Sequence, residues 1–530
     1  MIEIWSRGIF IVVSVILIIV TGALGAISPS LWWLYILVAP FVIIGVVDMV
    51  QTRRAVLRNF PALGHFRYLL ESIRPEIQQY FIESEEDEIP FSRAKRSVVY
   101  QRAKRSLDTL PFGTLRDVNK VGYEWITHSM KPAKLDHCNC RVTIGEGVCK
   151  QPYDAALLNI SAMSYGALSK NAILALSKGA KSGGFYHNTG EGGLSPYHLE
   201  GGADLVWQVG TGYFGCRKPD GAFCPDTFKQ KATSTPSVKM IEIKISQGAK
   251  PGHGGILPAA KVSKEISEIR GVPMGKDVIS PPGHSAFDTP EELMEFVAKL
   301  RELSGGKPVG FKMCLGYERE LMATVKAMVK TGITPDFITI DGAEGGTGAA
   351  PLEFSNSVGS PLNYGIRFIH NALVGAGVRK KIKIIAAGKI TTGYHIVSKL
   401  ASGVDLCNAA RSMMFALGCI QARQCNTNHC PVGVATQDPK LGKGLDIDDK
   451  ARRVANFQAL TVESALDLLG AAGLKDLRDL SPSHIRKRTV TGEVRGLNEI
   501  HVTLEEGSLV NGTAPERMAL MWEEAATDHF

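Results

Sequence analysis

The chain has 530 residues, of which 45% are hydrophobic and 21% charged, and its formal net charge at pH 7 is +8. This composition is typical of globular proteins with a large core. The modest charge, with no basic stripe interleaved with aromatic residues, gives no reason to expect a nucleic-acid partner. Ten cysteines are too few for a disulfide scaffold.

Two uncharged apolar runs open the chain, residues 9–27 and 31–47, and a three-residue turn separates them. As helices they would reach about 26–29 Å, close to the hydrocarbon thickness of about 30 Å. Basic residues flank the pair: Arg7, Arg53, Arg54 and Arg58. The positive-inside rule therefore places both ends in the cytoplasm. We predict a transmembrane hairpin over residues 1–50 that holds a cytoplasmic domain at the cell membrane. A signal peptide and a buried core hairpin are the alternatives.

Residues 51–150 alternate basic and acidic stretches and carry no catalytic motif. We expect a cytoplasmic connecting segment, with helical periodicity over residues 66–81 and basic residues able to contact anionic head groups. Cys138, Cys140 and Cys149 form a loose group here, but they lack a clear fourth partner. We do not assign a metal site to them.

From about residue 154, short apolar runs recur, each followed by a glycine-rich or polar loop and a helical stretch. Six runs are clear: 157–161, 240–245, 308–312, 336–340, 383–387 and 404–407. Fully apolar strands that alternate with helices indicate a parallel sheet covered on both faces.

With two further strands, residues 151–440 are predicted to form an α/β fold, a (β/α)8 TIM barrel. Its active site should lie at the C-terminal ends of the strands. A doubly wound open sheet is the alternative, although no G-x-G-x-x-G follows the first strand. Residues 441–530 should form a helical C-terminal extension.

Three cysteines fall within twelve residues, at Cys419, Cys425 and Cys430, and Pro431 follows directly. Soft thiolates select iron–sulfur clusters or zinc, and a proline after the last ligand recurs in iron–sulfur loops. Three protein ligands suit a cluster that lacks one iron. Structural zinc would need a fourth ligand, for which His429 is a candidate, and buried structural thiols are a third interpretation.

The segment 418–437 (GCIQARQCNTNHCPVGVATQ) closely resembles the iron–sulfur loop of glutamate synthases, in which three cysteines hold a [3Fe-4S] cluster. Five other stretches resemble the FMN-binding synthase domain of that family, in the same order: 160–169, 188–193, 242–252, 279–282 and 341–348. Together they cover about residues 110–490. The resemblance therefore implies an FMN-binding (β/α)8 domain with a [3Fe-4S] cluster at the three cysteines.

The resemblance also implies where FMN binds. The backbone of Ala162, Met163 and Ser164 would lie along the flavin edge, and Lys244 would stabilise the anionic reduced flavin. Loops at the ends of late strands would approach the ribityl and phosphate groups. The candidates in these loops are Gly345, Gly346, Thr347, Gly388, Ala410 and Arg411.

A second implied site binds the substrate, 2-oxoglutarate, through charged and polar residues. The candidates are Glu191, Lys244, Gln247, Lys250 and Arg270. A dicarboxylate needs two cationic anchors, and a guanidinium offers a bidentate one. Glu191 would serve as a proton donor or as an orienting group.

The sequence departs from complete glutamate synthases in having a hairpin in place of the glutaminase domain and no room for the central and C-terminal β-helix domains. It also reads Pro281-Pro-Gly-His-Ser285 where the family has Pro-Pro-Pro-His-His. We therefore expect a stand-alone synthase domain that needs a separate ammonia source and a separate electron donor, either ferredoxin-like or a reductase subunit.

The expected activity passes electrons through the iron–sulfur cluster and FMN to reduce an imino acid formed from 2-oxoglutarate and ammonia or an amine. One alternative is a membrane-tethered amino-acid dehydrogenase that runs in the oxidative direction. Another is a non-catalytic, redox-sensing membrane module.

Overall fold

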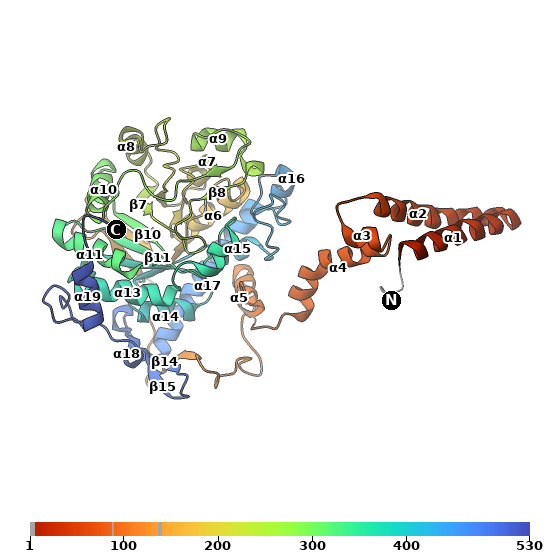
Figure 1. Ribbon diagram of the computed structural model, residues 1–530. Helices are drawn as coiled ribbons and strands as arrows, with labels where there is room; N and C mark the ends of the chain where they lie inside the picture. Colours follow the sequence, from red (N-terminus) through yellow and green to blue (C-terminus); the bar gives the residue numbers. More distant parts are fainter. Residues whose placement is uncertain (1–5, 87–88, 136–139) are drawn as a thin grey trace. The chain divides into compact units, whose positions relative to one another are not determined.

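A computed structural model describes residues 6–86, 89–135 and 140–530, so Cys138 lies outside the described residues. The chain folds as two compact units, one up to Arg93 and one from Ala94 to Phe530 (Figure 1). We describe each unit by itself.

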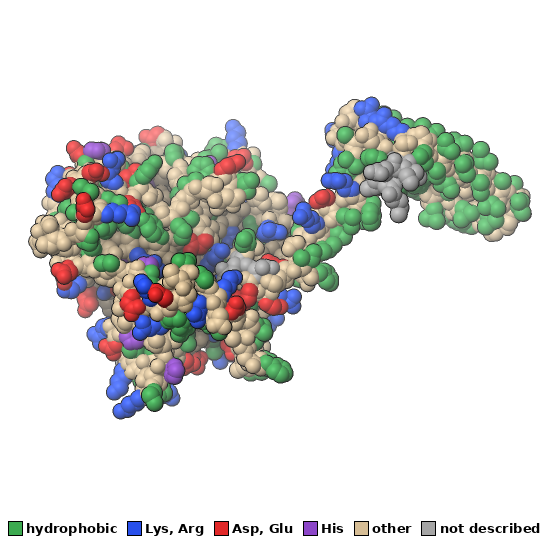
Figure 2. Space-filling view, turned by 60° about the horizontal axis from the view of Figure 1, so that its bottom comes forward, with side chains coloured by type: hydrophobic (Ala, Val, Ile, Leu, Met, Phe, Trp, Pro, Cys, Tyr) green, Lys and Arg blue, Asp and Glu red, His purple; other side chains and the backbone are tan. Residues whose placement is uncertain are grey.

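The first unit contains the two apolar helices, α1 (Arg7–Ile27) and α2 (Tyr35–Val50), joined by the short helix η1 (Pro29–Leu34). Both spans are long and apolar enough to cross a membrane, a criterion that a signal sequence or a core helix would also meet. Only 22% and 17% of the two apolar spans are buried, and hydrophobic side chains cover most of the hairpin surface (Figure 2). The helices pack through Phe10, whose ring lies 5.5 Å from that of Phe41.

The second unit is built on eight parallel strands that close into a barrel, which confirms the predicted (β/α)8 fold and rules out an open sheet. In barrel order the strands are β4 (Leu158–Ile160), β5 (His187–Asn188), β6 (Leu205–Val209), β7 (Val238–Lys244), β10 (Val309–Met313), β11 (Phe337–Asp341), β12 (Lys383–Ala387) and β13 (Leu406–Ala409). β13 pairs with β4 to close the ring. The six apolar runs singled out in the sequence correspond to β4, β7, β10, β11, β12 and β13.

Helices cover the outside of the barrel (Figure 1). Seven of them are α6 (Lys170–Gly183), α8 (Pro225–Ser234), α10 (Pro290–Leu303), α11 (Glu318–Thr331), α13 (Leu362–Gly375), α14 (Gly393–Ala401) and α17 (Ile447–Ala471). α17 packs against α6 and α14, where a Cβ added to Gly179 would lie 2.7 Å from the carbonyl oxygen of Ala451. The helical layer therefore continues into the residues expected to form a C-terminal extension.

The N-terminal end of the barrel is closed by a hairpin of β2 (Arg141–Ile144) and β3 (Tyr153–Ala156). Its side chains join residues from the strands in one buried hydrophobic cluster: Ile144, Tyr153, Ala155, Tyr186, Val206, Met240, Phe337, Ile385 and Leu406. Cys149 lies in the turn of this hairpin, and burial beside Asp336 raises its pKa to about 12. The barrel is a packed core, and an active site is expected at its opposite, C-terminal end.

Inside the barrel a buried carboxylate, Glu242 on β7, is held by neutral donors. Its oxygens accept hydrogen bonds from Asn188 Nδ2 at 2.8 Å, Gln208 Nε2 at 2.6 Å and Thr339 Oγ1 at 2.7 Å. These donors come from β5, β6 and β11, so one side chain ties four strands together. Buried polar groups that are fully hydrogen-bonded specify a unique arrangement of the core.

The C-terminal part also contains a small sheet that the sequence did not predict. β1 (Glu124–Ile126), β14 (Ile485–Arg488) and β15 (Val494–Gly496) form an antiparallel sheet, and Lys487 Nζ lies 2.8 Å from Glu124 Oε1. The remaining helices here are α16 (Pro439–Gly442), α18 (Leu497–Ile500) and α19 (Glu516–Glu524). All three strands are short and carry charged residues. β1 lies about 360 residues before its partner β14 in the sequence, so no local pattern predicts their pairing.

Gly248, in the loop after β7, tests how tightly the barrel mouth is packed. A Cβ there would lie 1.7 Å from the carbonyl oxygen of Gly342 in the loop after β11. We expect Gly248→Ala to lower the free energy of unfolding by about 1–3 kcal/mol or more, because the backbones must separate. Denaturant unfolding of the detergent-solubilised chain measures this.

Gly316, after β10, is the matched control because a Cβ there meets no atom within 4 Å. Gly316→Ala should leave stability unchanged or slightly raise it. Equal stability of the two variants would show that the loops after β7 and β11 are not in contact.

Candidate active site

The residues predicted for the two ligands lie on two halves of the barrel mouth. The candidates for FMN follow β4, β11, β12 and β13, which are consecutive around the barrel. The candidates for the substrate follow β5 and β7, with Arg270 at the end of the short helix α9 (Lys264–Arg270) between β7 and β10. We call these two groups the predicted cofactor half and the predicted substrate half of the mouth.

An ion pair forms the centre of the substrate half. Lys244 Nζ, at the end of β7, lies 2.8 Å from Glu191 Oε1 in the loop after β5, and both side chains are largely buried. Burial alone would raise the pKa of Glu191, but Lys244, Arg270 and Lys250 outweigh it and hold that pKa below its usual value. Glu191 is therefore a carboxylate at neutral pH.

Lys250 and Arg270 bring two more buried cations to this carboxylate. Lys250 Nζ donates to the carbonyl oxygen of Ala349 at 2.7 Å, and burial, together with Lys244, lowers its pKa to about 8. Arg270 Nη2 donates to the carbonyl oxygen of Tyr165 at 3.0 Å and to Ser164 Oγ at 3.4 Å. Burial lowers the pKa of Arg270 to about 10, and its Nε has no hydrogen-bonding partner.

Gln247 is half-buried and lies between Lys244 and Lys250 in the sequence. Its backbone carbonyl oxygen accepts a hydrogen bond from the N–H of Lys250 at 3.3 Å. Within the described part of the chain, its side-chain amide makes no hydrogen bond. The structure thus brings together four charged residues predicted for the substrate and leaves Gln247 beside them with free donors and acceptors.

Glycines make room for the charged groups. A Cβ on Gly255 would lie 2.2 Å from Glu191 Oε1, and one on Gly192 would lie 2.8 Å from Arg270 Nη2. Larger residues at either position would displace the carboxylate or the guanidinium. Gly192, in the 188–193 stretch, and Gly255, just beyond the 242–252 stretch, therefore leave room for the charged cluster.

His284 and Tyr213 support the ion pair from outside, and sequence reasoning did not identify them. His284 Nε2 donates to the carbonyl oxygen of Lys244 at 2.9 Å, and Tyr213 Oη donates to Nδ1 at 3.0 Å. Burial lowers the pKa of His284 to about 4, so the ring is neutral and keeps this tautomer. His284 lies in the Pro-Pro-Gly-His-Ser segment, which the sequence analysis had singled out. Its place in that segment is the feature from which its role could have been predicted.

In the cofactor half, Arg411 connects two predicted sites. Its Nη2 donates to the carbonyl oxygen of Thr347, and its Nη1 lies 3.7 Å from Cys425 Sγ. A Cβ on Gly346 would lie 3.0 Å from Arg411 Nε, so the glycine loop and the guanidinium are in close contact. At the end of β4, the Met163 N–H donates to the carbonyl oxygen of Asn188 at 3.2 Å, which positions the Ala162–Ser164 backbone.

The cysteine loop has an unusual backbone. Gln421, Arg423 and Asn428 have positive φ values of 60°, 55° and 68°. Non-glycine residues rarely adopt this conformation, and it clusters where a loop is shaped for function. Burial raises the pKa of Cys419, and Cys425 and Cys430 act in the same direction, so the three thiols are neighbours.

The loop is held by a buried lysine that the sequence analysis missed. Lys261 Nζ donates to the carbonyl oxygens of Cys425 at 2.7 Å, Ala435 at 3.0 Å and Ala167 at 3.2 Å. Nothing in its sequence context distinguishes Lys261 from a surface lysine. It fastens the cysteine loop to the loop after β4.

A single metal ion does not suit this arrangement. Among the residues that the structure describes, no three His, Cys, Asp or Glu side chains are placed to hold one ion. Zinc would need its sulfur ligands at about 2.3 Å from one point. His429 is also exposed, which disfavours it as a fourth ligand.

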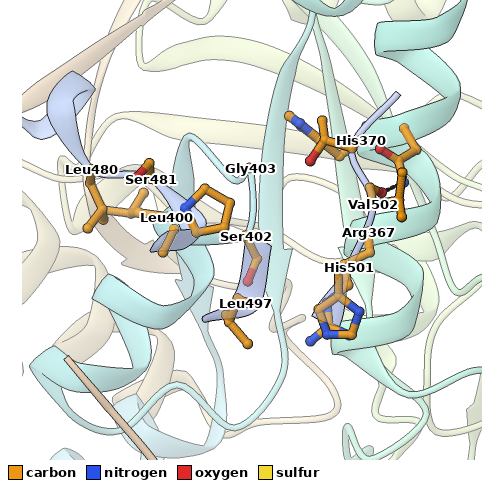
Figure 3. A pocket seen from close by; sticks show the side chains of 14 residues that line it. Arg367, His370, Leu400, Ser402, Gly403, Leu480, Ser481, Leu497, His501 and Val502 are labelled. Atoms are coloured by element: carbon orange, nitrogen blue, oxygen red, sulfur yellow. Dashed lines mark hydrogen bonds between the residues drawn. The ribbon is translucent and has the colours of Figure 1, made fainter. Parts of the chain in front are cut away.

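Two cavities lie outside the charged pocket. One, of 580 Å3, adjoins the mouth and is lined by Phe214, Arg217 and the 276–285 segment. Phe214 separates it from Arg270, whose guanidinium carbon lies 5.2 Å from the ring centre. The other, of 240 Å3, contains Arg367 and His501 (Figure 3). It lies where α14 leads into β13, at the opposite end from the usual catalytic face.

A family model described as a conserved region in glutamate synthase matches residues 124–475. The chain is 39% identical over 501 residues to the glutamate synthase large subunit-like protein YerD of Bacillus subtilis (strain 168), covering 87% of this chain and 95% of YerD. The chain belongs to the glutamate synthase family.

Other members of the family also match. The archaeal glutamate synthase (NADPH) of Methanocaldococcus jannaschii is 39% identical over 342 residues, covering 64% of this chain and 62% of that enzyme. The ferredoxin-dependent glutamate synthase of Antithamnion sp. is 30% identical over 441 residues, covering 80% and 27%. The chain thus corresponds to less than two thirds of the archaeal enzyme and to about a quarter of the Antithamnion one.

Solved structures with a related architecture include a mandelate oxidase mutant with the monooxide FMN adduct, at 14% identity and a TM-score of 0.40, covering 82% of this chain and 99% of that one. A flavocytochrome b2 mutant with pyruvate bound has 12% identity and a TM-score of 0.43, covering 86% and 91%. The family assignment rests on the sequence comparisons, and the named members of this glutamate synthase family are oxidoreductases.

The charge balance of the pocket can be tested at Glu191. We expect Glu191→Gln to lower the free energy of unfolding at pH 7 by about 3–5 kcal/mol, because three buried cations lose their counter-charge. A depressed pKa stabilises the fold above the unfolded value of 4.5, and this contribution is lost as the pH falls through the depressed value.

The difference between wild type and variant should therefore shrink below pH 4.5, as measured by denaturant unfolding at several pH values. Glu295→Gln, at an exposed position on α10, is the control and should change little. A difference that does not depend on pH would mean that Glu191 is not charged in the folded chain.

Proposed function

We propose that the chain reduces an imino acid formed from 2-oxoglutarate and ammonia or an amine, in a flavin-dependent reaction. The observation that carries the proposal is the excess of buried positive charge in the barrel mouth. Lys244, Lys250 and Arg270 face one carboxylate, Glu191. Uncompensated buried charge is costly, and a bound dianion offsets it.

The geometry suggests a role for each residue. Arg270, with an unpaired Nε, suits bidentate binding of one carboxylate, and Lys250 suits a second anionic group. Because the pKa of Glu191 is low, we favour an orienting role for it over proton donation. Lys250, with a pKa of about 8, is the group that can exchange a proton near neutral pH.

We further propose that FMN binds in the cofactor half of the mouth, between the Ala162–Ser164 backbone and the loops that contain Gly345, Gly388 and Arg411. This half fits a phosphate-bearing cofactor because glycine loops from consecutive strands expose their backbone there and Arg411 adds a cation. Bound FMN would supply hydride transfer. We propose that Lys244 contacts both the cofactor and the substrate, because the loop that follows it meets the loop after β11 at Gly248 and Gly342.

The cysteine loop is proposed to hold a [3Fe-4S] cluster at Cys419, Cys425 and Cys430. The donor set fits, because three neighbouring thiols sit on a shaped loop with Arg411 and Lys261 beside it, and cations favour thiolates. Arg411 touches both the glycine loop and Cys425, so the proposed cofactor sites adjoin. Electrons would come from a separate donor, a ferredoxin-like protein or a reductase subunit, and ammonia from a separate source.

We also propose that the hairpin places the chain in the cell membrane as a multi-pass protein with its catalytic unit in the cytoplasm. The exposed apolar surfaces of α1 and α2 support this. The same feature favours a second function, an amino-acid dehydrogenase that delivers electrons to membrane carriers. The non-catalytic module is disfavoured because such a protein needs no buried dicarboxylate pocket.

The main test uses the full chain, purified anaerobically in detergent. We expect the visible absorption of oxidised flavin, which dithionite removes and 2-oxoglutarate with ammonia restores. Arg270→Lys should raise the apparent KM for 2-oxoglutarate about tenfold or more, because a lysine cannot bind bidentately. Arg452→Lys, at an exposed position on α17, should not change it.

An absent flavin band would disprove every redox function proposed here. Reoxidation by monocarboxylic oxo acids in preference to 2-oxoglutarate would contradict the dicarboxylate pocket. If glutamate reduces the flavin faster than 2-oxoglutarate with ammonia oxidises it, the dehydrogenase function is the correct one.

The cluster ligands are tested with Cys425→Ser, measured by iron content and flavin absorbance. We expect iron to be lost and flavin to be retained, because Cys425 belongs to the cysteine loop and not to the glycine loops that are proposed to bind FMN. Cys224→Ser, at the start of α8, is the control and should keep both. Full iron content in Cys425→Ser would show that the ligand assignment is wrong.

A further inference from the structure

The first unit has a second apolar feature besides the hairpin. After α2, the short helix α3 (Ala55–Asn59) leads to α4 (Gly64–Ile77), which continues as η2 (Gln78–Ile82). Large apolar side chains of α4 are exposed: Phe66 63%, Leu69 55%, Leu70 45%, Ile73 39% and Ile77 36%. Such exposure along a whole helix is unusual for a protein in water and marks a contact surface.

These side chains form one stripe. Their spacing of three, four, seven and eleven residues after Phe66 puts all five on the same side of a helix that turns by about 100° per residue. Arg67 and Arg74 follow one edge of the stripe, Glu76 lies at the other edge, and Glu71 lies farther round on the polar side. The helix is therefore amphipathic, with arginines along one border of the stripe.

The first unit holds α4 by its other side. Asp48 Oδ1, near the end of α2, lies 2.9 Å from His65 Nε2, and Asp48 Oδ2 accepts the N–H of Ala62 at 3.0 Å. The Arg54 guanidinium lies 4.5 Å from the ring centre of Tyr68. His65 and Tyr68 both point away from the stripe, so these contacts leave the apolar side chains uncovered.

The same contacts place α4 at the basic end of the hairpin. At the start of α1, Arg7 Nε donates to the carbonyl oxygen of Arg58 at 2.6 Å, and its Nη2 lies 3.3 Å from Asn59 Oδ1. The start of α1 and the end of α2 thus meet where α3 and α4 begin. In a bilayer, this end of a hairpin lies at the cytoplasmic membrane surface.

We propose that α4 lies in the membrane–water interface, with its apolar stripe among the acyl chains and Arg67 and Arg74 against anionic head groups. The occupant of the stripe is the bilayer, because the stripe belongs to the same unit as the apolar hairpin, begins at the hairpin's basic end and has arginines along one border. This rests on the proposed membrane insertion of the hairpin. It would fix the connection to the catalytic unit at the membrane surface.

The test uses the full chain in vesicles of phosphatidylcholine and phosphatidylglycerol, with a photoreactive phenylalanine analogue at one position at a time. Phe66 and Ile73 probe the stripe, Glu71 is the control on the polar side, and Ile16 on α1 reports the hairpin. We expect lipid adducts by mass spectrometry at Ile16, Phe66 and Ile73, and about tenfold less adduct at Glu71.

Other outcomes overturn the proposal in distinguishable ways. Lipid adducts at Ile16 with protein cross-links at Phe66 would mean that the catalytic unit or a second copy covers the stripe. Equal lipid adducts at Phe66 and Glu71 would mean that the helix has no fixed orientation. No lipid adduct at Ile16 would refute the membrane hairpin and the interfacial helix together.

A second variant gives an independent measurement. Phe66→Gln with Leu70→Gln keeps helix propensity but weakens the stripe. Trypsin cleavage after Arg67 in vesicles should become about tenfold faster, whereas Glu71→Gln should leave the rate unchanged. An unchanged rate in the double variant would overturn the proposal.

Discussion

The ion pair between Lys244 and Glu191 is the contact on which the organisation of the barrel mouth depends. It joins the end of β7 to the loop after β5 and so spans β6. Burial strengthens the ion pair. Lys250 and Arg270 approach the same carboxylate, so three buried positive charges face one negative charge. The positive charge that remains would favour an anion in the proposed substrate site.

Neutral groups keep this charged pair in place. His284 and Tyr213 hold the backbone of Lys244 from one side, and glycines leave space for the carboxylate and the guanidinium on the other. One layer deeper, Glu242 binds only neutral donors, so that it does not compete with Glu191 for the cations. Along β7, Glu242 therefore lies in the neutral interior and Lys244, two residues later, lies in the charged mouth.

The barrel could be predicted from the sequence because six of its strands are continuous apolar runs, and the place of Lys244 because it ends such a run. The other members of the charged cluster followed only from the resemblance to glutamate synthases. The contacts of His284 and Lys261 could not, since each acts on a backbone carbonyl that only the folded chain brings near. The sheet of β1, β14 and β15 was missed because its strands are short and polar. α17 was recognised as helical, but its place between α14 and α6 is set by packing at Gly179, which a local pattern does not reveal.

The closure of the barrel has a consequence for how the chain is made. β4 leaves the ribosome early, yet its partner β13 follows about 250 residues later, and α17, which covers the seam, later still. Until β13 is made, one edge of β4 has no partner strand, and by then the apolar hairpin has already left the ribosome. Synthesis must therefore protect the half-built barrel. With the proposed insertion of the hairpin, membrane targeting and chaperone binding to the nascent chain would compete for the same interval.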